Sequence, residues 1–293
     1  LNISRETLQH DGQLKLIAKT LEKKIKSELE KMLRDEREAY EEFFKAFGIQ
    51  LKFGIYNDYG AHKETLRDLL IFRSSNEKKY VTLKEYISRM KEGQDSIYYA
   101  CGETDEKIDM LPQTDAVRDK GYEILYLTEN VDEFALKMLA EYDGKKFVNI
   151  CDNDLNLDSE DEKKALEEEN TAAKDMFEAM KESIGDKINA VRFTNKLKDH
   201  PVCLTSEGGI SLEMEKVLNS MPGAEQNKVK AQLVLEINAN HPIAEKLKTL
   251  YNEDKDTLGK YAKLLYGEAC LIGGKSVPDP AEHSALVCEL MTK

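Results

Sequence analysis

The sequence predicts a chain of mixed α and β structure, in which a small three-layer βαβαβ module precedes an α+β C-terminal domain. Three short apolar runs, rich in β-branched and aromatic residues, have the length of buried strands. Two helix-length intervals separate them, which indicates a parallel sheet with right-handed crossovers. The second interval opens on Asn130, an expected helix cap with Glu133 three residues later. The runs cover residues 97–101, 122–127 and 147–151.

Composition narrows the class of protein. The 293 residues suffice for one to three domains with sizeable cores, and a net charge of −13 disfavours nucleic acid and anionic membranes as main partners. No apolar run approaches the ~20 residues that span a bilayer, and no signal peptide is expected. Five scattered cysteines without C-x-x-C spacing favour reduced thiols in a cytoplasm, and the scattered histidines predict no metal site.

The N-terminus begins at Leu1 without methionine, so we expect a piece of a longer protein. Ser4 can cap a helix on which Arg5 and Gln9 share a face. On spacing alone this is an ordinary surface pair. Arg5 is nevertheless unfavourable in a first turn, because the helix dipole is positive there.

Residues 11–80 are predicted to form a helical connector. Apolar positions three and four apart indicate one long helix that breaks at 34–38, then a second cluster that ends at Gly48. A third helix is expected through Leu66, Leu69, Leu70 and Phe72, after a turn region at 54–61. Thr82 and Glu85 form a capping box for a helix through Met90, which leads into the module at 81–151.

A βαβαβ unit often binds a nucleotide, so the turn after its first strand is informative. Residues 101–106 contain one glycine and three acids instead of G-x-G-x-x-G, and phosphate would be repelled there. A structural and protein-contact module is therefore favoured over a cofactor site. An enzyme that binds a nucleotide or flavin stays as the alternative.

Residues 152–169 mark a domain boundary, because half of them are acidic and none is aromatic or β-branched. We expect a solvated linker rather than an acidic regulatory tail, followed by a helix at 171–184. The C-terminal domain then covers 170–293, with strands at 191–194, 202–205 and 233–237.

An amphipathic helix is predicted at 210–221, between Gly208-Gly209 and Pro222-Gly223, which would let it detach. Its stripe is either core packing or an adaptable binding surface of the kind that methionines supply. The stripe consists of Ile210, Met214, Val217, Leu218 and Met221.

Two helices at the end of the chain predict a homodimer. The first carries a coiled-coil-like seam, and the second opens on an Asp279 cap with Pro280 at its first position. A twofold four-helix bundle would cover the apolar surface of both helices. The expected interface residues are Leu258, Ala262, Leu265, Ala269, Ile272, Leu286 and Leu290.

Several motifs together resemble the heat-shock protein 90 chaperone family in its bacterial form. Residues 1–9 are similar to its L-N-[VIL]-S-R-E-x-L-Q motif, and 88–99 to its S-R-M-K-E-x-Q-x-x-I-Y-Y block. Further matches occur at 132–134, 141–145, 235–241 and 279–280, so the resemblance covers essentially the whole chain. It identifies residues 1–151 as the later part of the middle domain, with 1–10 as the catalytic-loop segment, and residues 170–293, after the linker, as the C-terminal dimerisation domain.

The resemblance implies a division of roles. Arg5 and Gln9 would assist ATP hydrolysis by an amino-terminal domain that the chain lacks, so this fragment needs no cofactor, while ATP and magnesium belong to the full-length parent. The amphipathic helix would contact unfolded or partly folded client proteins. Phe134 stands where bacterial members often carry Trp and would contribute to that contact.

The end of the chain lacks the M-E-E-V-D tail of eukaryotic cytosolic members, which implies no tetratricopeptide co-chaperone. A passive dimeric scaffold without client binding is a further alternative to a chaperone.

Overall fold

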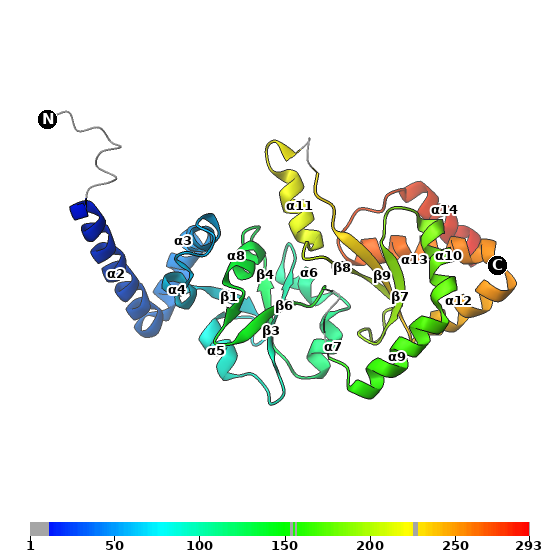
Figure 1. The fold of residues 1–293 in the computed structure, drawn as a ribbon, viewed down its shortest axis with the longest axis horizontal. Coiled ribbons are helices and arrows are strands. Elements are labelled where there is room, and N and C mark those ends of the chain that lie inside the picture. The colour runs from blue at the N-terminus through cyan, green and yellow to red at the C-terminus, as the bar shows by residue number, and fades with distance from the viewer. Residues whose placement is uncertain (1–11, 153–154, 156, 225–227, 293) are drawn as a thin grey trace.

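The computed structural model describes residues 12–152, 155, 157–224 and 228–292. Figure 1 shows an elongated molecule, with helices at the N-terminal end, a mixed sheet in the middle and a smaller sheet among helices at the C-terminal end. The predicted α+β class is confirmed. The N-terminal elements are α2 (Gly12–Asp35), α3 (Arg37–Asn57), α4 (Lys63–Leu66), the 3-10 helix η1 (Arg67–Leu69), β1 (Ile71–Ser74) and β2 (Tyr80–Thr82).

The long helical stretch breaks near residue 36, as predicted, and α3 follows. Gly48 lies within α3 and does not end it. The glycine makes room for the Phe44 ring, since a Cβ at residue 48 would lie 2.7 Å from Phe44 Cε1. The helix continues to Asn57, and positive φ at Tyr59 and Gly60 then turns the chain. The apolar stripe of α2 stays exposed up to Ile25.

The predicted third helix is wrong beyond Leu69. Phe72 lies in β1, which pairs antiparallel with β2 and with a strand of the module, so the sheet extends into the range predicted as connector. The run at residues 69–72 is apolar throughout, and such a short run fits a buried strand as well as a helix. Here pairing with neighbouring strands makes its second half a strand.

The module contains the predicted βαβαβ unit. Its strands run in the order β2-β1-β4-β3-β6-β5, and β3 pairs parallel with both β4 and β6. The remaining elements are α5 (Leu83–Ser88), β3 (Ser96–Cys101), α6 (Asp105–Asp109), α7 (Thr114–Asp119), β4 (Ile124–Leu127), α8 (Asp132–Leu139), β5 (Glu141–Tyr142) and β6 (Lys145–Asn149).

Alternate residues of the central strands β3 and β4 enter two different cores, which produces the three layers. On β3, Ile97 and Tyr99 face α3, α5 and α8, whereas Tyr98 and Ala100 face α6 and α7. Both faces of the central strands are therefore buried, as expected for parallel strands covered by helices.

Local caps follow the sequence in part. The capping box of Thr82 and Glu85 is confirmed. The predicted Asn130 cap of α8 is wrong: Val131 takes the N-cap position, and the Asp132 carboxylate instead accepts a hydrogen bond of 3.1 Å from the backbone N–H of Glu129.

The acidic stretch is not extended linker throughout, because its second half forms α9 (Glu160–Ala172) behind a capping box of Ser159 and Glu162. The α9 helix packs on β7, the edge strand of the sheet β7-β9-β8. The C-terminal elements are α10 (Lys174–Ile184), β7 (Ala190–Thr194), β8 (Val202–Glu207), α11 (Leu212–Ser220), β9 (Gln232–Asn238), α12 (Pro242–Glu253), α13 (Lys255–Ile272) and α14 (Pro280–Met291).

The C-terminal core lies between this sheet and helices α10, α12 and α13. The predicted strands are confirmed, and so are the Asp279 cap and the position of Pro280 on α14.

The module and the C-terminal domain are joined by direct hydrogen bonds. Gln113 Nε2 donates to the Leu204 carbonyl at 2.9 Å, and the Ser206 N–H donates to the Cys151 carbonyl at 3.2 Å.

Candidate functional site

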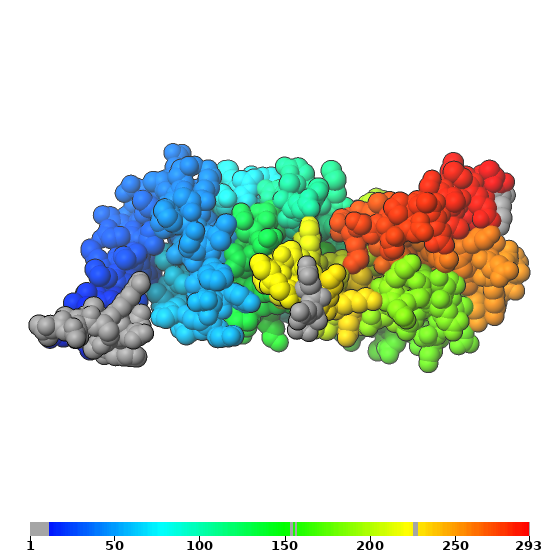
Figure 2. Space-filling view, turned by 90° about the horizontal axis from the view of Figure 1, so that it is seen from above, coloured from blue at the N-terminus to red at the C-terminus, as the bar shows by residue number. Residues whose placement is uncertain are grey.

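The α11 helix stands at the junction between the module and the C-terminal domain (Figures 1 and 2). It is shorter than predicted: Ile210 precedes the Ser211 N-cap and Met221 is the C-cap residue. Gly208 and Gly209 before it both have φ near +80°, a conformation that glycine adopts without strain. The chain can therefore turn sharply from β8 into the helix.

The stripe of α11 is only partly covered. Met214 is buried, Ile210, Val217 and Leu218 are half-buried, and Met221 is 44% exposed. One side of the helix therefore packs on the protein and the other carries apolar surface into solvent.

Phe134 lies beneath α11 rather than on the open surface. It is 7% exposed, and its ring packs edge-on against Tyr56 of α3 at 5.4 Å between centroids. Together with Met214 and Val217 it lines a cleft of about 200 Å³ between the module and α11. The two segments predicted to contact clients thus meet at one place.

The mouth of this cleft is acidic. Glu103, Glu129 and Glu213 line it beside Lys216. The pKa of Glu103 is lowered to about 2, because hydrogen bonds from Lys107 and then Lys216 stabilise the charged carboxylate. Glu103 therefore remains ionised at neutral pH. Its carboxylate lies 3.1 Å from Nζ of Lys216, and this ion pair connects the outer face of α11 to the module.

The far end of α11 is fastened to the returning chain. The Asn219 side chain donates to the Val229 carbonyl at 2.8 Å and accepts from its N–H at 2.9 Å. Glu215 accepts from the Ala231 N–H at 2.8 Å and pairs with Lys275. These contacts hold α11 to its own domain, independently of the module.

The residues predicted for the dimer interface separate into two groups. Four lie in the core of their own chain, where the rest of the domain already covers them: Leu258, Ala262, Leu265 and Ala269. Ile272 and Leu290 are half-buried, and Leu286 is buried where α14 meets α13. Near them, Leu271 and Met291 are 55% and 80% exposed.

Ion pairs fasten α14 to α13. They join Lys260 to Glu289 at 2.5 Å and Lys263 to Glu282 at 2.7 Å. In addition, Nε2 of the His283 imidazole lies 3.1 Å from the Glu268 carboxylate. Gly267 allows the close approach, because a Cβ there would lie 2.7 Å from His283 Cε1.

Arg5 and Gln9 lie outside the described residues. The motif block at 88–99, which the structure describes, has a structural role. Its Gln94 side chain and its Tyr98 N–H both donate hydrogen bonds to the Tyr86 hydroxyl, which in turn donates to the Glu123 carbonyl. Glycine is needed in the turn after β3 for the close packing of α6, because a Cβ on Gly102 would lie 2.7 Å from the Ile108 side chain.

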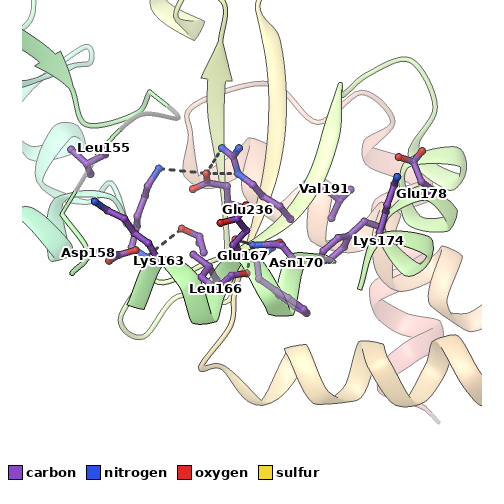
Figure 3. Close-up of a pocket in the computed structure, with 15 residues that line it drawn as sticks. Leu155, Asp158, Lys163, Leu166, Glu167, Asn170, Lys174, Glu178, Val191 and Glu236 are labelled. Carbon is purple, nitrogen blue, oxygen red and sulfur yellow. Dashed lines mark hydrogen bonds and ion pairs between the residues drawn. The ribbon is translucent and has the colours of Figure 1, made fainter. Parts of the chain in front are cut away.

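A larger groove of about 720 Å³ lies between α9, α10 and β7 (Figure 3). The buried carboxylate of Glu236 accepts hydrogen bonds from Arg192 at 2.6 and 3.0 Å and pairs with Lys196 at 3.5 Å. The Asn170 side chain accepts from the Phe193 N–H at 2.8 Å and donates to its carbonyl at 3.2 Å. None of the predicted site residues lines this groove.

No cation site is formed by three or more His, Cys, Asp or Glu side chains within the described ranges. Among the helices described, none is both long and apolar enough to cross a bilayer.

Sequence reasoning missed Glu133 and Ser211, which join the module to α11. Only the position of Ser211 before an apolar helix signalled a cap, and nothing signalled its partner.

Comparison with known proteins gives a consistent result. A family model described as Hsp90 protein matches residues 1–293. "Chaperone protein HtpG" of Bacillus subtilis is 53% identical over 291 residues, which cover 99% of this chain and 46% of that protein. Proteins of the same name from Clostridium perfringens and Clostridium acetobutylicum are 54% and 53% identical, with the same coverage. The chain therefore spans about half the length of these curated relatives.

Proposed function

The chain belongs to the Hsp90 protein family, and we propose that it is part of a molecular chaperone that binds partly unfolded client proteins as a homodimer. The observation that carries the proposal is the meeting of Phe134 and α11 at one cleft, although they lie far apart in the sequence. An apolar surface with an acidic rim suits unfolded segments that are rich in apolar and basic residues. A cytoplasmic location, in keeping with the reduced thiols, is part of the proposal.

The chemistry of α11 supports client binding. Methionine side chains adapt to many shapes, and the half-exposed positions of Val217 and Leu218 offer apolar contact without one fixed partner. Such a surface suits a protein that meets many different sequences.

Val217→Ser with Leu218→Ser tests this proposal in the 293-residue chain. We expect the double variant to suppress the aggregation of an unfolded model protein several-fold less than the unaltered chain. Leu16→Ser is the matched control, because Leu16 is an exposed apolar residue on α2. Full activity in the double variant would favour the passive scaffold.

Dimerisation is proposed through α14 and the end of α13. Leu271 and Met291 are exposed, and Ile272 and Leu290 are half-buried, so apolar surface remains there after the chain has folded. Light scattering should give about twice 33.4 kDa for the chain, and a mass near 33.4 kDa for Leu290→Asp or a chain cut before Asp279. Leu16→Asp should remain dimeric. A monomer for the unaltered chain would contradict the proposal.

ATP hydrolysis is proposed for the longer protein, with magnesium, and not for this fragment alone. There Arg5 and Gln9 would act on the γ-phosphate, since a fixed guanidinium stabilises charge that develops on a phosphoryl group. Arg5→Ala in the longer protein should lower the rate of hydrolysis by roughly 10²–10³-fold. Nucleotide titration of the 293-residue chain should give no saturable binding; saturation would favour the alternative of a nucleotide-binding enzyme.

A further inference from the structure

The carboxylate of Glu133 is buried next to Phe134 and interacts with neutral donors. Glu133 is 4% exposed, and its Oε1 accepts hydrogen bonds from the Tyr99 hydroxyl at 3.1 Å and from Asn149 Nδ2 at 3.0 Å. Its Oε2 accepts from the Ser211 hydroxyl. Across the described ranges no cationic side chain forms a salt bridge with it. These three hydrogen bonds supply the buried carboxylate with polar partners.

The three donors belong to two domains. Tyr99 and Asn149 lie on β3 and β6 of the module, whereas Ser211 precedes α11 in the C-terminal domain. The two oxygens of one carboxylate thus connect the sheet to the helix. Burial, and then the charge of Glu133, raise the pKa of the neighbouring Tyr99 and Cys101, as expected beside a buried anion.

Ser211 has two roles that need the same hydroxyl group. Its oxygen accepts a hydrogen bond of 3.1 Å from the Met214 N–H, which caps α11, while its proton goes to Glu133. The end of the helix is therefore defined by a group whose orientation the module controls. An acceptor without a proton could cap α11 but could not bind Glu133.

The other polar contacts between α11 and the module are exposed. Lys137 donates to the Gly209 carbonyl at 2.7 Å, and Lys216 pairs with Glu103 at 3.1 Å. Exposed pairs of this kind contribute little, whereas a hydrogen bond to a buried charge contributes more. The Glu133 contact is therefore the principal polar connection that holds the start of α11 in place.

We propose that Glu133 is a positioning residue that clasps α11 against the module, and that client segments compete with this docked state for the α11 face. The docked helix buries Met214 and turns part of Val217 into the cleft, so the whole apolar face becomes available only when the helix moves away. The clasp follows from the geometry alone. Competition with clients rests on the proposed function.

Ser211→Asp separates the clasp from the cap. Aspartate is as good an N-cap as serine, but it has no proton to donate and places a second carboxylate beside Glu133. In the 293-residue chain we expect amide hydrogen exchange of α11 to become about ten- to a hundredfold faster, the range for loss of a hydrogen bond to a charge. Glu133→Gln combined with Ser211→Asp should restore slow exchange, because the Gln amide can donate to the new carboxylate.

Ser159→Asp is the matched control. Ser159 caps α9, and its hydroxyl likewise donates to a glutamate, Glu162, far from α11. This variant should leave exchange in α11 unchanged. Unchanged exchange in Ser211→Asp would overturn the clasp, and so would fast exchange that the double variant fails to restore.

A second readout tests competition with clients. The apparent dissociation constant for a reduced and alkylated, permanently unfolded protein should fall in Ser211→Asp by up to the factor seen in exchange, since a larger share of the molecules is competent to bind. Exchange in α11 could rise in Ser211→Asp and be restored in the double variant, while binding of the unfolded protein is unchanged or weaker. In that case the contact between Glu133 and Ser211 does hold α11 in place. The α11 face is then not the client surface, and the competition is overturned.

Discussion

The α11 and α13 helices carry apolar residues at the same three- and four-residue spacing, yet they meet different surroundings. The predicted stripe of α13 lies in the core of its own domain up to Ala269, packed against α10 and β8. On α11 only Met214 is buried, and Met221 is 44% exposed. Spacing therefore identifies the apolar face of a helix, whereas the fold decides what covers that face.

The difference has a physical origin in the connections of each helix. The α13 helix follows α12 directly and runs across the C-terminal sheet, so its neighbours cover it along most of its length. The α11 helix is entered through Gly208 and Gly209 and meets the module along one side only. A helix attached in this way keeps apolar surface that another chain can use.

The largest effect is expected for Leu258→Ala on α13. Removing a fully buried leucine side chain leaves a cavity and should lower the free energy of unfolding by about 2–5 kcal/mol. Leu218→Ala on α11, the matched control, should lower it by less than about 1 kcal/mol, because Leu218 is half-exposed. Denaturant titration at two protein concentrations provides the measurement. A similar loss in both variants would contradict the contrast between the two helices.

Gly267→Ala is expected to have an intermediate effect, because it forces the His283 ring away from α13. Overpacking of this kind should lower the free energy of unfolding by about 1–3 kcal/mol and loosen α14. Thermal unfolding and hydrogen exchange of α14 would measure both changes. Adding His283→Ala should restore most of the loss; if it does not, the close approach is not the cause.

The smallest effect is expected for Glu103→Gln in the turn after β3, where Glu103 pairs with Lys216 of α11. The pKa of Glu103 is held at about 2 by Lys107 and then Lys216, below its ordinary value of 4.5, so its stabilisation is present above about pH 4.5 and is lost as the pH falls toward 2. The variant lacks this contribution, and its unfolding midpoint should fall less steeply between about pH 5 and about pH 3. Parallel curves for the two proteins would mean that the pair adds nothing.

Much of the fold follows from local sequence signals. The parallel strands of the module, the capping box of Thr82 and the Asp279-Pro280 start of α14 depend on neighbouring residues, and all are confirmed. The failures depend on distant ones. Phe72 lies in a strand because β4 is available to pair with β1, and Val131 replaces Asn130 as the N-cap of a helix that the surrounding core positions.

The candidate site was predictable in its parts but not in its assembly. Phe134 and the stripe of α11 were identified through the family resemblance and the spacing. The contact between Glu133 and Ser211 joins residues 78 positions apart, and no local pattern relates them. A buried acid that begins a helix is ordinary in sequence terms, and its significance comes only from the domain that faces it.

The side chain of Asn170 has a consequence for one edge of the C-terminal sheet. The β7 strand is an edge of its sheet, and an open edge is a template to which any extended chain can add as a further strand. The carboxamide of Asn170 has one donor and one acceptor in the same arrangement as a peptide group, and it occupies both backbone groups of Phe193. At this position α9 therefore takes the place on the sheet edge that an added strand would need.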